Sequence, residues 1–133
     1  MNSNKIVERK NLGFFGENLA ARYLESKGYK ILFRNYQKPW GEIDIIAEEE
    51  GVIVFCEVKT SKNIISSIDE ESDNAFNPEV RVNPKKMSHI VRTASIFMNS
   101  NRRYLDKEWR VDIVSILLNK LDKKASLKHF KNV

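Results

Sequence analysis

Two acidic residues and a lysine flank a short acidic turn, and their types suit metal-dependent phosphate chemistry. Asp44 precedes the turn, and Glu57, Val58 and Lys59 follow it. Hard divalent cations such as Mg²⁺ or Mn²⁺ prefer oxygen ligands, so Asp44, Glu57 and the carbonyl of Val58 form a candidate metal site. A lysine beside such a site can hold or deprotonate an attacking water, or stabilise charge on a phosphate. Metal and lysine together suit in-line attack of water on a phosphodiester.

The segments on either side of the turn predict a β-hairpin, because both are rich in Ile, Val and Phe and are bounded by turn residues. With the turn centred on Glu49-Glu50, Asp44 faces Phe55 and shares one face of the sheet with Glu57. A turn one residue longer or shorter would reverse this arrangement. Both faces are otherwise apolar, which predicts central strands covered on both sides. Charges there cost free energy unless they are paired or bind a metal.

A structural salt bridge is the competing interpretation. Glu57 and Lys59 are two residues apart on a strand, and they can pair with each other or across the hairpin. The presence of Asp44 on the same face, and of a further acid upstream, favours a functional site. Glu42 also shares the face of Asp44, and it is equally well interpreted as a further ligand or as an outer acid.

The rest of the chain predicts the elements that position these residues. The periodicity of apolar residues predicts a helix over 11–27, ended by Gly28. A second helix begins at Asn83-Pro84, with Asn83 as the N-cap. Further strands are predicted over 30–36 and 109–118. The order helix, three strands, helix, strand predicts an α/β or α+β domain, with a central mixed sheet flanked by helices.

Length and composition predict one domain over residues 1–133. The stretch 61–82 is rich in Ser, Asp, Glu and Asn, and we expect it to be a mobile loop. The basic tail 119–133 is expected to be weakly ordered.

The overall composition is that of a soluble domain, with 41% hydrophobic and 31% charged residues. No apolar run approaches the ~20 residues of a membrane helix, so no membrane partner is expected. The N-terminus lacks the apolar stretch of a signal peptide, and Cys56 is the only cysteine. These features favour the cytoplasm. A net charge of +5 is compatible with a nucleic-acid partner.

The hairpin with its Glu57-x-Lys59 motif resembles the active-site motif of the PD-(D/E)XK nucleases. A larger set of motifs resembles the YraN-like bacterial family, which is similar to archaeal Holliday-junction resolvases. The likeness covers nearly the whole chain. Its motifs are Gly16-Glu17-x-x-Ala20-x-x-Tyr23-Leu24, Gly28-Tyr29, Arg34-Asn35, the run from Gly41 to Ala47 and Phe55-x-Glu57-Val58-Lys59.

This resemblance implies a restriction-endonuclease-like core, a Mg²⁺ or Mn²⁺ cofactor and DNA as the partner. It also suggests a homodimer. It implies a catalytic set, namely Glu17, Asp44, Glu57 and Lys59, and it adds Glu17 to the metal ligands Asp44, Glu57 and Val58. From its helical position alone, Glu17 would be a solvated residue at the edge of the apolar stripe.

Basic residues outside the motif are candidates for binding nucleic acid. Relatives in the resembled family carry a basic residue shortly after the motif lysine, and Lys62 is the substitute here. Lys85, Lys86 and Arg92 gather on and beside the polar side of the second helix. A solvated helix face is the favoured interpretation of these three, with phosphate contact second.

Other charged residues predict no site. Arg110 and Asp112 share one face of the last strand and are interpreted as a surface ion pair. His129 is isolated in sequence, and nothing suggests zinc.

Three functions compete. The first is a metal-dependent endonuclease acting on branched or otherwise structured DNA, in which the choice of DNA structure comes from the family resemblance alone. The second is a nuclease fold that binds nucleic acid without cutting it. A phosphodiesterase for a small molecule is the third, and the absence of a Gly-rich phosphate loop makes it less attractive.

Overall fold

The computed structural model describes the backbone of residues 3–63 and 82–133 and the side chains of 11–62 and 82–133. Most of the predicted loop 61–82 therefore lies outside the described residues, and Ser61 itself still belongs to a strand. The elements follow the chain in the order α1 (Ser3–Ser26), β1 (Lys30–Lys38), β2 (Gly41–Glu49), β3 (Val52–Asn63), α2 (Pro84–Ser100), β4 (Trp109–Asn119) and β5 (Ala125–Phe130).

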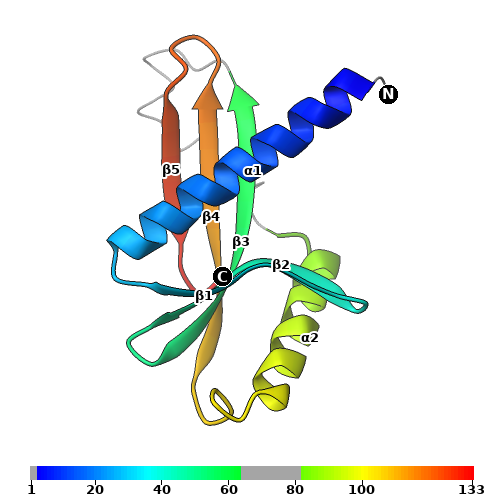
Figure 1. Cartoon of the computed structure of the whole chain (residues 1–133), viewed down its shortest axis with the longest axis vertical. Coiled ribbons are helices and arrows are strands. Elements are labelled where there is room, and N and C mark those ends of the chain that lie inside the picture. Colours follow the sequence, from blue (N-terminus) through cyan, green and yellow to red (C-terminus); the bar gives the residue numbers. More distant parts are fainter. Residues whose placement is uncertain (1–2, 64–81) are drawn as a thin grey trace.

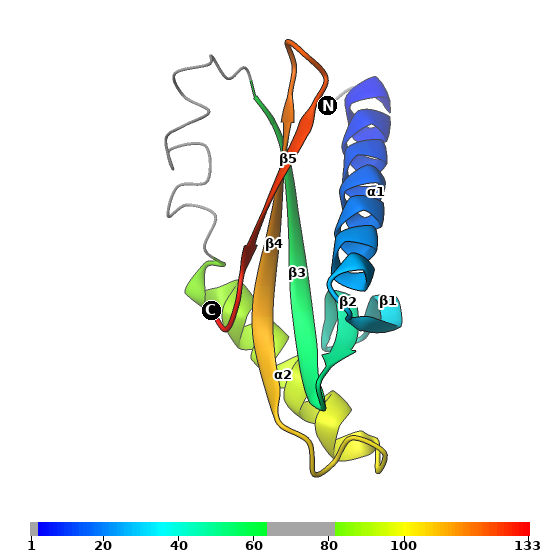
Figure 2. The same cartoon turned by 90° about the vertical axis from the view of Figure 1, so that its left-hand side faces the viewer.

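The strands form one open mixed sheet, which confirms the predicted α/β architecture. Their order in the sheet is β1-β2-β3-β4-β5. The central pair, β3 and β4, is parallel, and the other three pairs are antiparallel. Figures 1 and 2 show α1 lying along one face of this sheet and α2 on the other. Among the helices that the structure describes, none is long and apolar enough to cross a membrane.

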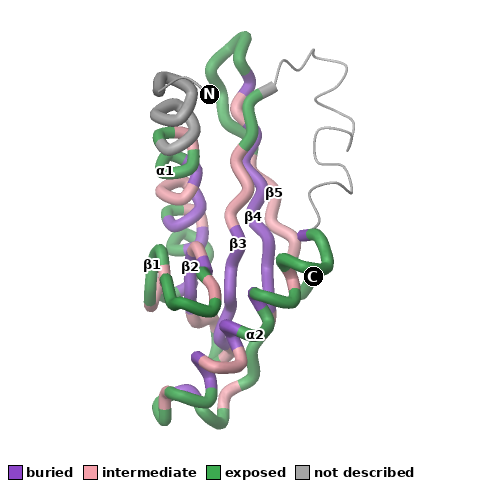
Figure 3. Tube along the Cα trace, turned by 90° about the vertical axis from the view of Figure 1, so that its right-hand side faces the viewer, coloured by how far each residue is buried: buried purple, intermediate pink, exposed green. Residues whose placement is uncertain are grey.

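The hydrophobic core has two layers, one on each face of the sheet. Buried residues concentrate on β3 and β4 (Figure 3). Phe55 and Ile113 pack toward α2, with Phe97 of that helix. Cys56 and Val114 pack toward α1, with Leu24 of that helix. Because successive strand residues alternate, each central strand contributes to both layers.

The hairpin between β2 and β3 turns one residue later than predicted. Glu49 pairs with Val52, so the turn consists of Glu50 and Gly51, with φ values of 50° and 82°. Positive φ at both positions is the signature of a type I′ turn, whose twist matches that of the strands. The predicted pairing of Asp44 with Phe55 is therefore wrong, because Ile46 pairs with Phe55. The pairing shifts by two residues, an even number, so the predicted faces are kept.

Helix α1 ends as predicted and begins earlier. Gly28 has φ 92°, and the amide of Tyr29 donates to the carbonyl of Leu24 at 3.0 Å. This is a Schellman ending with glycine in the left-handed position. The helix already includes Ser3, several residues before the predicted start at Asn11.

Helix α2 begins as predicted. The side chain of Asn83 accepts a hydrogen bond from the amide of Lys86 at 2.8 Å, and Pro84 occupies the first turn. Asn83 therefore satisfies one of the amides that a helix start leaves without a partner.

The tail 119–133 is not the weakly ordered segment that was expected. Residues 125–130 form β5, which pairs antiparallel with β4 from Leu118↔Ala125 to Ile113↔Phe130. Leu127 and Phe130 pack against the core layers on opposite faces of the sheet. This strand is short and carries Lys and His, so its pattern is too weak to recognise before its partner strand is known.

Candidate active site

Asp44 lies where β2 leaves β3. The ladder between these strands runs from Glu49↔Val52 to Ile45↔Cys56, and Asp44 is the next residue of β2. Its Oδ2 accepts a hydrogen bond from the amide of Val58 at 2.8 Å. A side-chain carboxylate thus replaces a main-chain carbonyl at this position.

Asp44 and Glu57 form a carboxylate pair. They would be opposite one another if the β2–β3 pairing continued by one step, and the Glu57 side chain is only 7% exposed. Burial, followed by the charge of Glu57, raises the pKa of Asp44 from 3.8 to about 7, although the Val58 amide opposes this shift. Two acids held this close cannot both be charged at low cost without a cation between them.

Lys86 of α2 supplies one cation to this pair. Its Nζ forms an ion pair with Oε1 of Glu57. Partial burial by itself lowers the pKa of Lys86, but Glu57, Asp44 and Glu42 together raise it above its ordinary value. Lys86 was predicted as a nucleic-acid contact on a solvated helix face, and the structure places its half-exposed side chain beside the acidic residues.

Lys59 lies on the same face of β3 as Glu57, because the two are separated by one residue. The backbone register places Lys59 opposite Ser115 of β4, one step beyond the pair of Glu57 and Ile113. The side chain is half-buried. The spacing of the motif therefore brings its lysine to the face that carries the carboxylates.

Glu17 of α1 acts on the site electrostatically, because its negative charge affects the pKa of Asp44. Its Oε1 lies 3.4 Å from Nε of Arg34, and its charge is a lesser cause of the raised pKa of Asp44. Helix α1 lies very close to β3 at Gly16, where an added Cβ would overlap the side chain of Thr60. Glycine at this position lets α1 sit directly on the strand that carries Glu57.

The other predicted contacts are exposed side chains. Lys85 and Arg92 are exposed on α2, and Glu42 is exposed at the start of β2. Lys62 is exposed near the end of β3 and alternates with Lys59, so it lies on the side of Thr60 and α1. The structure thus brings Asp44, Glu57 and Lys86 together, and of these four exposed residues Glu42 lies near enough for its charge to help raise the pKa of Lys86.

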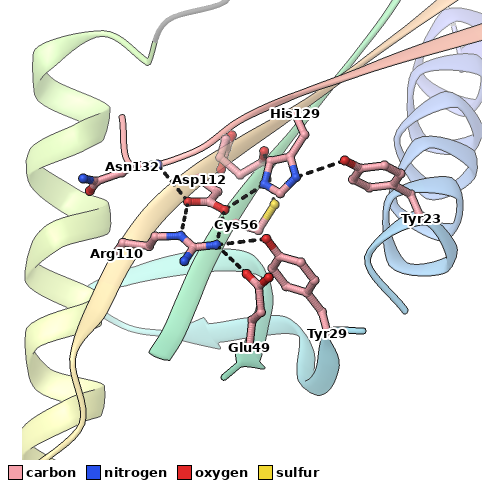
Figure 4. A network of polar contacts seen from close by, with 9 residues as sticks. Tyr23, Tyr29, Glu49, Cys56, Arg110, Asp112, His129 and Asn132 are labelled. Atoms are coloured by element: carbon pink, nitrogen blue, oxygen red, sulfur yellow. Dashed lines mark hydrogen bonds and ion pairs between the residues drawn. The ribbon is translucent and has the colours of Figure 1, made fainter. Parts of the chain in front are cut away.

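Sequence reasoning missed a polar network on the α1 side of the sheet (Figure 4). Asp112 is fully buried, and its carboxylate accepts from Arg110 Nε and from the amide of Asn132, both at 3.0 Å. His129 Nε2 lies 2.7 Å from the other Asp112 oxygen, and its Nδ1 lies 3.3 Å from the hydroxyl of Tyr23. The predicted surface ion pair is therefore buried, and His129 is not isolated.

The rest of this network joins Arg110 to the residue before β1 and to the last residue of β2. Its Nη2 donates at 2.9 Å both to the Tyr29 hydroxyl and to Oε2 of Glu49. Burial disfavours the charged form of Asp112, yet hydrogen bonds from His129, Arg110 and the Asn132 amide lower its pKa. Asp112 pairs in register with Cys56, on the face opposite Glu57. The network therefore ties together α1, β4 and the C-terminal segment rather than adding to the acidic pair.

Comparison with known proteins gives the family. The family model described as "Uncharacterised protein family UPF0102" matches residues 16–116. The chain belongs to this family. A UPF0102 protein of Syntrophomonas wolfei is 38% identical over 123 residues, covering 92% of this chain and 96% of the relative. A UPF0102 protein of Clostridium botulinum is 36% identical over 123 residues, covering 92% and 93%. A third, of a Sulfurihydrogenibium species, is 39% identical over 115 residues, covering 86% and 91%.

This membership confirms the YraN-like part of the sequence resemblance. The part of this UPF0102 chain that the family model matches includes Glu17, Asp44, Glu57, Lys59 and Lys86.

The acids of this UPF0102 protein fit a hard cation that keeps most of its water. Among the side chains that the structure describes, no group of three or more His, Cys, Asp or Glu residues is placed to hold a metal. Mg²⁺ commonly uses only one or two carboxylates and retains several waters. Asp44 and Glu57 supply two such carboxylates, with Glu57 paired to Lys86 and Glu17 paired to Arg34.

Proposed function

We propose that this UPF0102 protein is a metal-dependent endonuclease that hydrolyses phosphodiester bonds in branched or otherwise structured DNA. The observation that carries the proposal is the carboxylate pair of Asp44 and Glu57, with Lys59 on the same face. The restriction-endonuclease-like description of the core and the choice of DNA structure rest on the resemblance to nucleases and resolvases. That resemblance also supports a homodimer, and a DNA substrate supports a cytoplasmic location.

Each residue has a distinct role in the proposed reaction. Asp44, Glu57 and the Val58 carbonyl would hold Mg²⁺ or Mn²⁺, which would supply positive charge for a phosphate oxygen and make water a better nucleophile. Lys59 orients the attacking water or stabilises the charge that develops on the phosphate.

Glu17 and Lys86 act around this centre. Glu17 adds negative charge near Asp44 and so favours a cation between the acids. Lys86 neutralises Glu57 when no metal is present, because an unpaired buried carboxylate is costly. The exposed Lys62, Lys85 and Arg92 are candidates for contact with DNA phosphates away from the carboxylates.

One observation favours a second function, a nucleic-acid-binding module that does not cut. The ion pair between Lys86 and Glu57 already satisfies the buried acid without any metal. A protein that used the Lys86–Glu57 ion pair only for stability would need no metal ion at the site.

Metal-dependent cleavage distinguishes the two functions. Labelled single-stranded, duplex, flap and four-way DNAs should be incubated with the protein in Mg²⁺ or Mn²⁺, with EDTA as the control. The nuclease proposal predicts products that appear only with metal and that are absent for the Asp44→Asn, Glu57→Gln double variant. Tight binding without cleavage of any substrate would support the binding module.

A further inference from the structure

A second lysine lies on the carboxylate face of the sheet, and it comes from β5. Ser115 of β4 pairs with Lys59 on one side and with Lys128 on the other. Residues opposite one another across strands share a face. Two strand spacings separate Lys59 from Lys128, about 10 Å between their backbones. The C-terminal strand thus places a basic residue in the same cross-strand row as the motif lysine.

Lys128 leans toward the row that contains Glu57. Its Nζ lies 5.5 Å from the ring centroid of Phe130. Phe130 pairs with Ile113, and Ile113 pairs with Glu57. The ammonium group therefore extends along β5 to Phe130, which lies in the same cross-strand row as Glu57.

The turn between β4 and β5 carries three further exposed lysines: Lys120, Lys123 and Lys124. The turn is closed by its own hydrogen bonds. The amide of Asn119 donates to the carbonyl of Lys124, and the amide of Lys123 donates to the carbonyl of Asn119, both at 2.9 Å. Residues 119–133 contain five lysines and one aspartate, a net charge of +4, compared with +5 for the whole chain. Most of the net positive charge thus resides in residues 119–133, which include β5 and the turn before it.

The spacing of these lysines suits a nucleic-acid backbone. Glu57 lies beside Ile113, and β4 ends six residues later at Asn119, which corresponds to roughly 20 Å along a strand. Duplex DNA rises about 3.4 Å per base pair, so this length matches about six base pairs. A duplex whose scissile phosphate lay at the carboxylates would place later phosphates near the turn.

We propose that the β4–β5 hairpin is a phosphate-backbone binding surface for nucleic acid, with Lys128 beside the active site and Lys120, Lys123 and Lys124 at the far end. These four residues are named the hairpin lysines. The inference rests on the proposed function, since nucleic acid is chosen over other polyanions because the hairpin lysines begin near the proposed nuclease site. It assigns a role to the segment that the sequence pattern left as a basic tail.

Binding in EDTA tests the hairpin separately from cleavage. The probe is a fluorescein-labelled DNA duplex of about three helical turns, and fluorescence anisotropy is measured over a series of NaCl concentrations. The turn variant combines Lys120→Gln, Lys123→Asn and Lys124→Gln. Asparagine is chosen for Lys123 because that residue has φ 63°. Lys128→Met is a separate variant.

The matched control removes the same charge elsewhere. It combines Lys30→Gln, Arg102→Gln and Arg103→Gln, all exposed. Arg102 and Arg103 lie between α2 and β4, at the opposite end of β4 from the lysine turn (Figure 1). The thermal midpoint of each variant confirms that it is folded.

The turn variant should bind on the order of tenfold more weakly than the control, and its slope of log K against log salt should fall by roughly two to three. Lys128→Met should reduce the slope by about one. A turn variant with the affinity and slope of the control would overturn the inference, even if the wild type cuts DNA. Weaker binding to phosphatidylserine vesicles with unchanged DNA binding would also overturn it. Hairpin-dependent binding by a protein that cuts no DNA would support the inference and contradict the proposed function.

Discussion

The carboxylate of Asp44 takes the hydrogen bond of the Val58 amide, at 2.8 Å, at the point where two strands part. A β-ladder that simply ended there would leave this amide without a main-chain partner from β2. The side chain of the acid therefore performs two tasks, since it satisfies the backbone and is itself fixed beside Glu57. The parting of the strands and the candidate metal site are one structural feature.

The stability of the metal-free protein should decrease as the pH rises from about 4 to about 7. Burial and the charge of Glu57 raise the pKa of Asp44 from 3.8 to about 7. Between these values the folded protein keeps a proton that the unfolded chain has released, so the free energy of unfolding falls with rising pH. Asp44→Asn has no group to titrate and should flatten this dependence. Urea unfolding in EDTA at several pH values measures it, and an equally steep decrease in the variant would contradict the assignment.

Asp112 should show the opposite dependence on pH and a large effect on stability. Its pKa is lowered in the folded state, so its stabilising contribution is present above the unfolded value near 4 and is lost as the pH falls through the folded value.

Asp112→Asn should lower the free energy of unfolding by about 3 kcal/mol or more, because Arg110 and His129 lose their shared partner. The exposed Asp106→Asn is the control and should change stability by less than about 0.5 kcal/mol. Equal effects of the two substitutions in urea unfolding would show that the network stabilises nothing.

Two glycines of α1 should respond in opposite directions to alanine. Gly13 has no atom within 4 Å of the position that a Cβ would take, so Gly13→Ala should stabilise the helix by up to about 1 kcal/mol. A Cβ on Gly16 would overlap Thr60, so Gly16→Ala should destabilise the protein by about 1–3 kcal/mol. Adding Thr60→Gly should recover part of the loss specifically in the Gly16 variant. A stabilising Gly16→Ala would mean that α1 does not approach β3 this closely.

The turn of the β2–β3 hairpin should accept asparagine better than glutamate. Glu50 has φ 50°, a left-handed conformation that asparagine adopts readily and β-branched residues do not. Glu50→Asn should raise the free energy of unfolding by up to about 1 kcal/mol, whereas Glu50→Val should lower it. Thermal denaturation of this pair tests the register, since a turn placed elsewhere would not separate the two variants.

Local patterns predicted much of the fold. The cap at Asn83 and the ending at Gly28 depend on a few neighbouring residues, and both occur as expected. The shared face of Asp44 and Glu57 also follows from alternation, and it survives a register error of two residues. Such features depend on bonds and steric limits within a short stretch of chain, which a sequence displays directly.

Contacts between distant segments were not predictable in this way. Tyr23 and His129 are 106 residues apart, and only the folded sheet brings them together. Lys86 looked like part of a solvated helix face, because nothing in its local pattern points to Glu57. For Asp112, the local pair with Arg110 was visible, but its burial depends on β5 and the C-terminal segment that cover it. In the sequence, β5 shows as a return to apolar residues at Leu127 and Phe130, but this pattern alone is too weak to predict a strand.

Cleavage by the Lys59→Met variant is the most direct test of the proposed active site. The substitution keeps Asp44 and Glu57, so the variant should still bind Mn²⁺ in a calorimetric titration. It should also bind DNA nearly as well as the wild type, because one phosphate contact among several contributes little. The rate of metal-dependent cleavage should fall on the order of 10²-fold or more, since a group that acts only on the water or the developing charge is lost. A Lys59→Met protein that cuts as fast as the wild type would contradict the assignment of this lysine and of the site built around it.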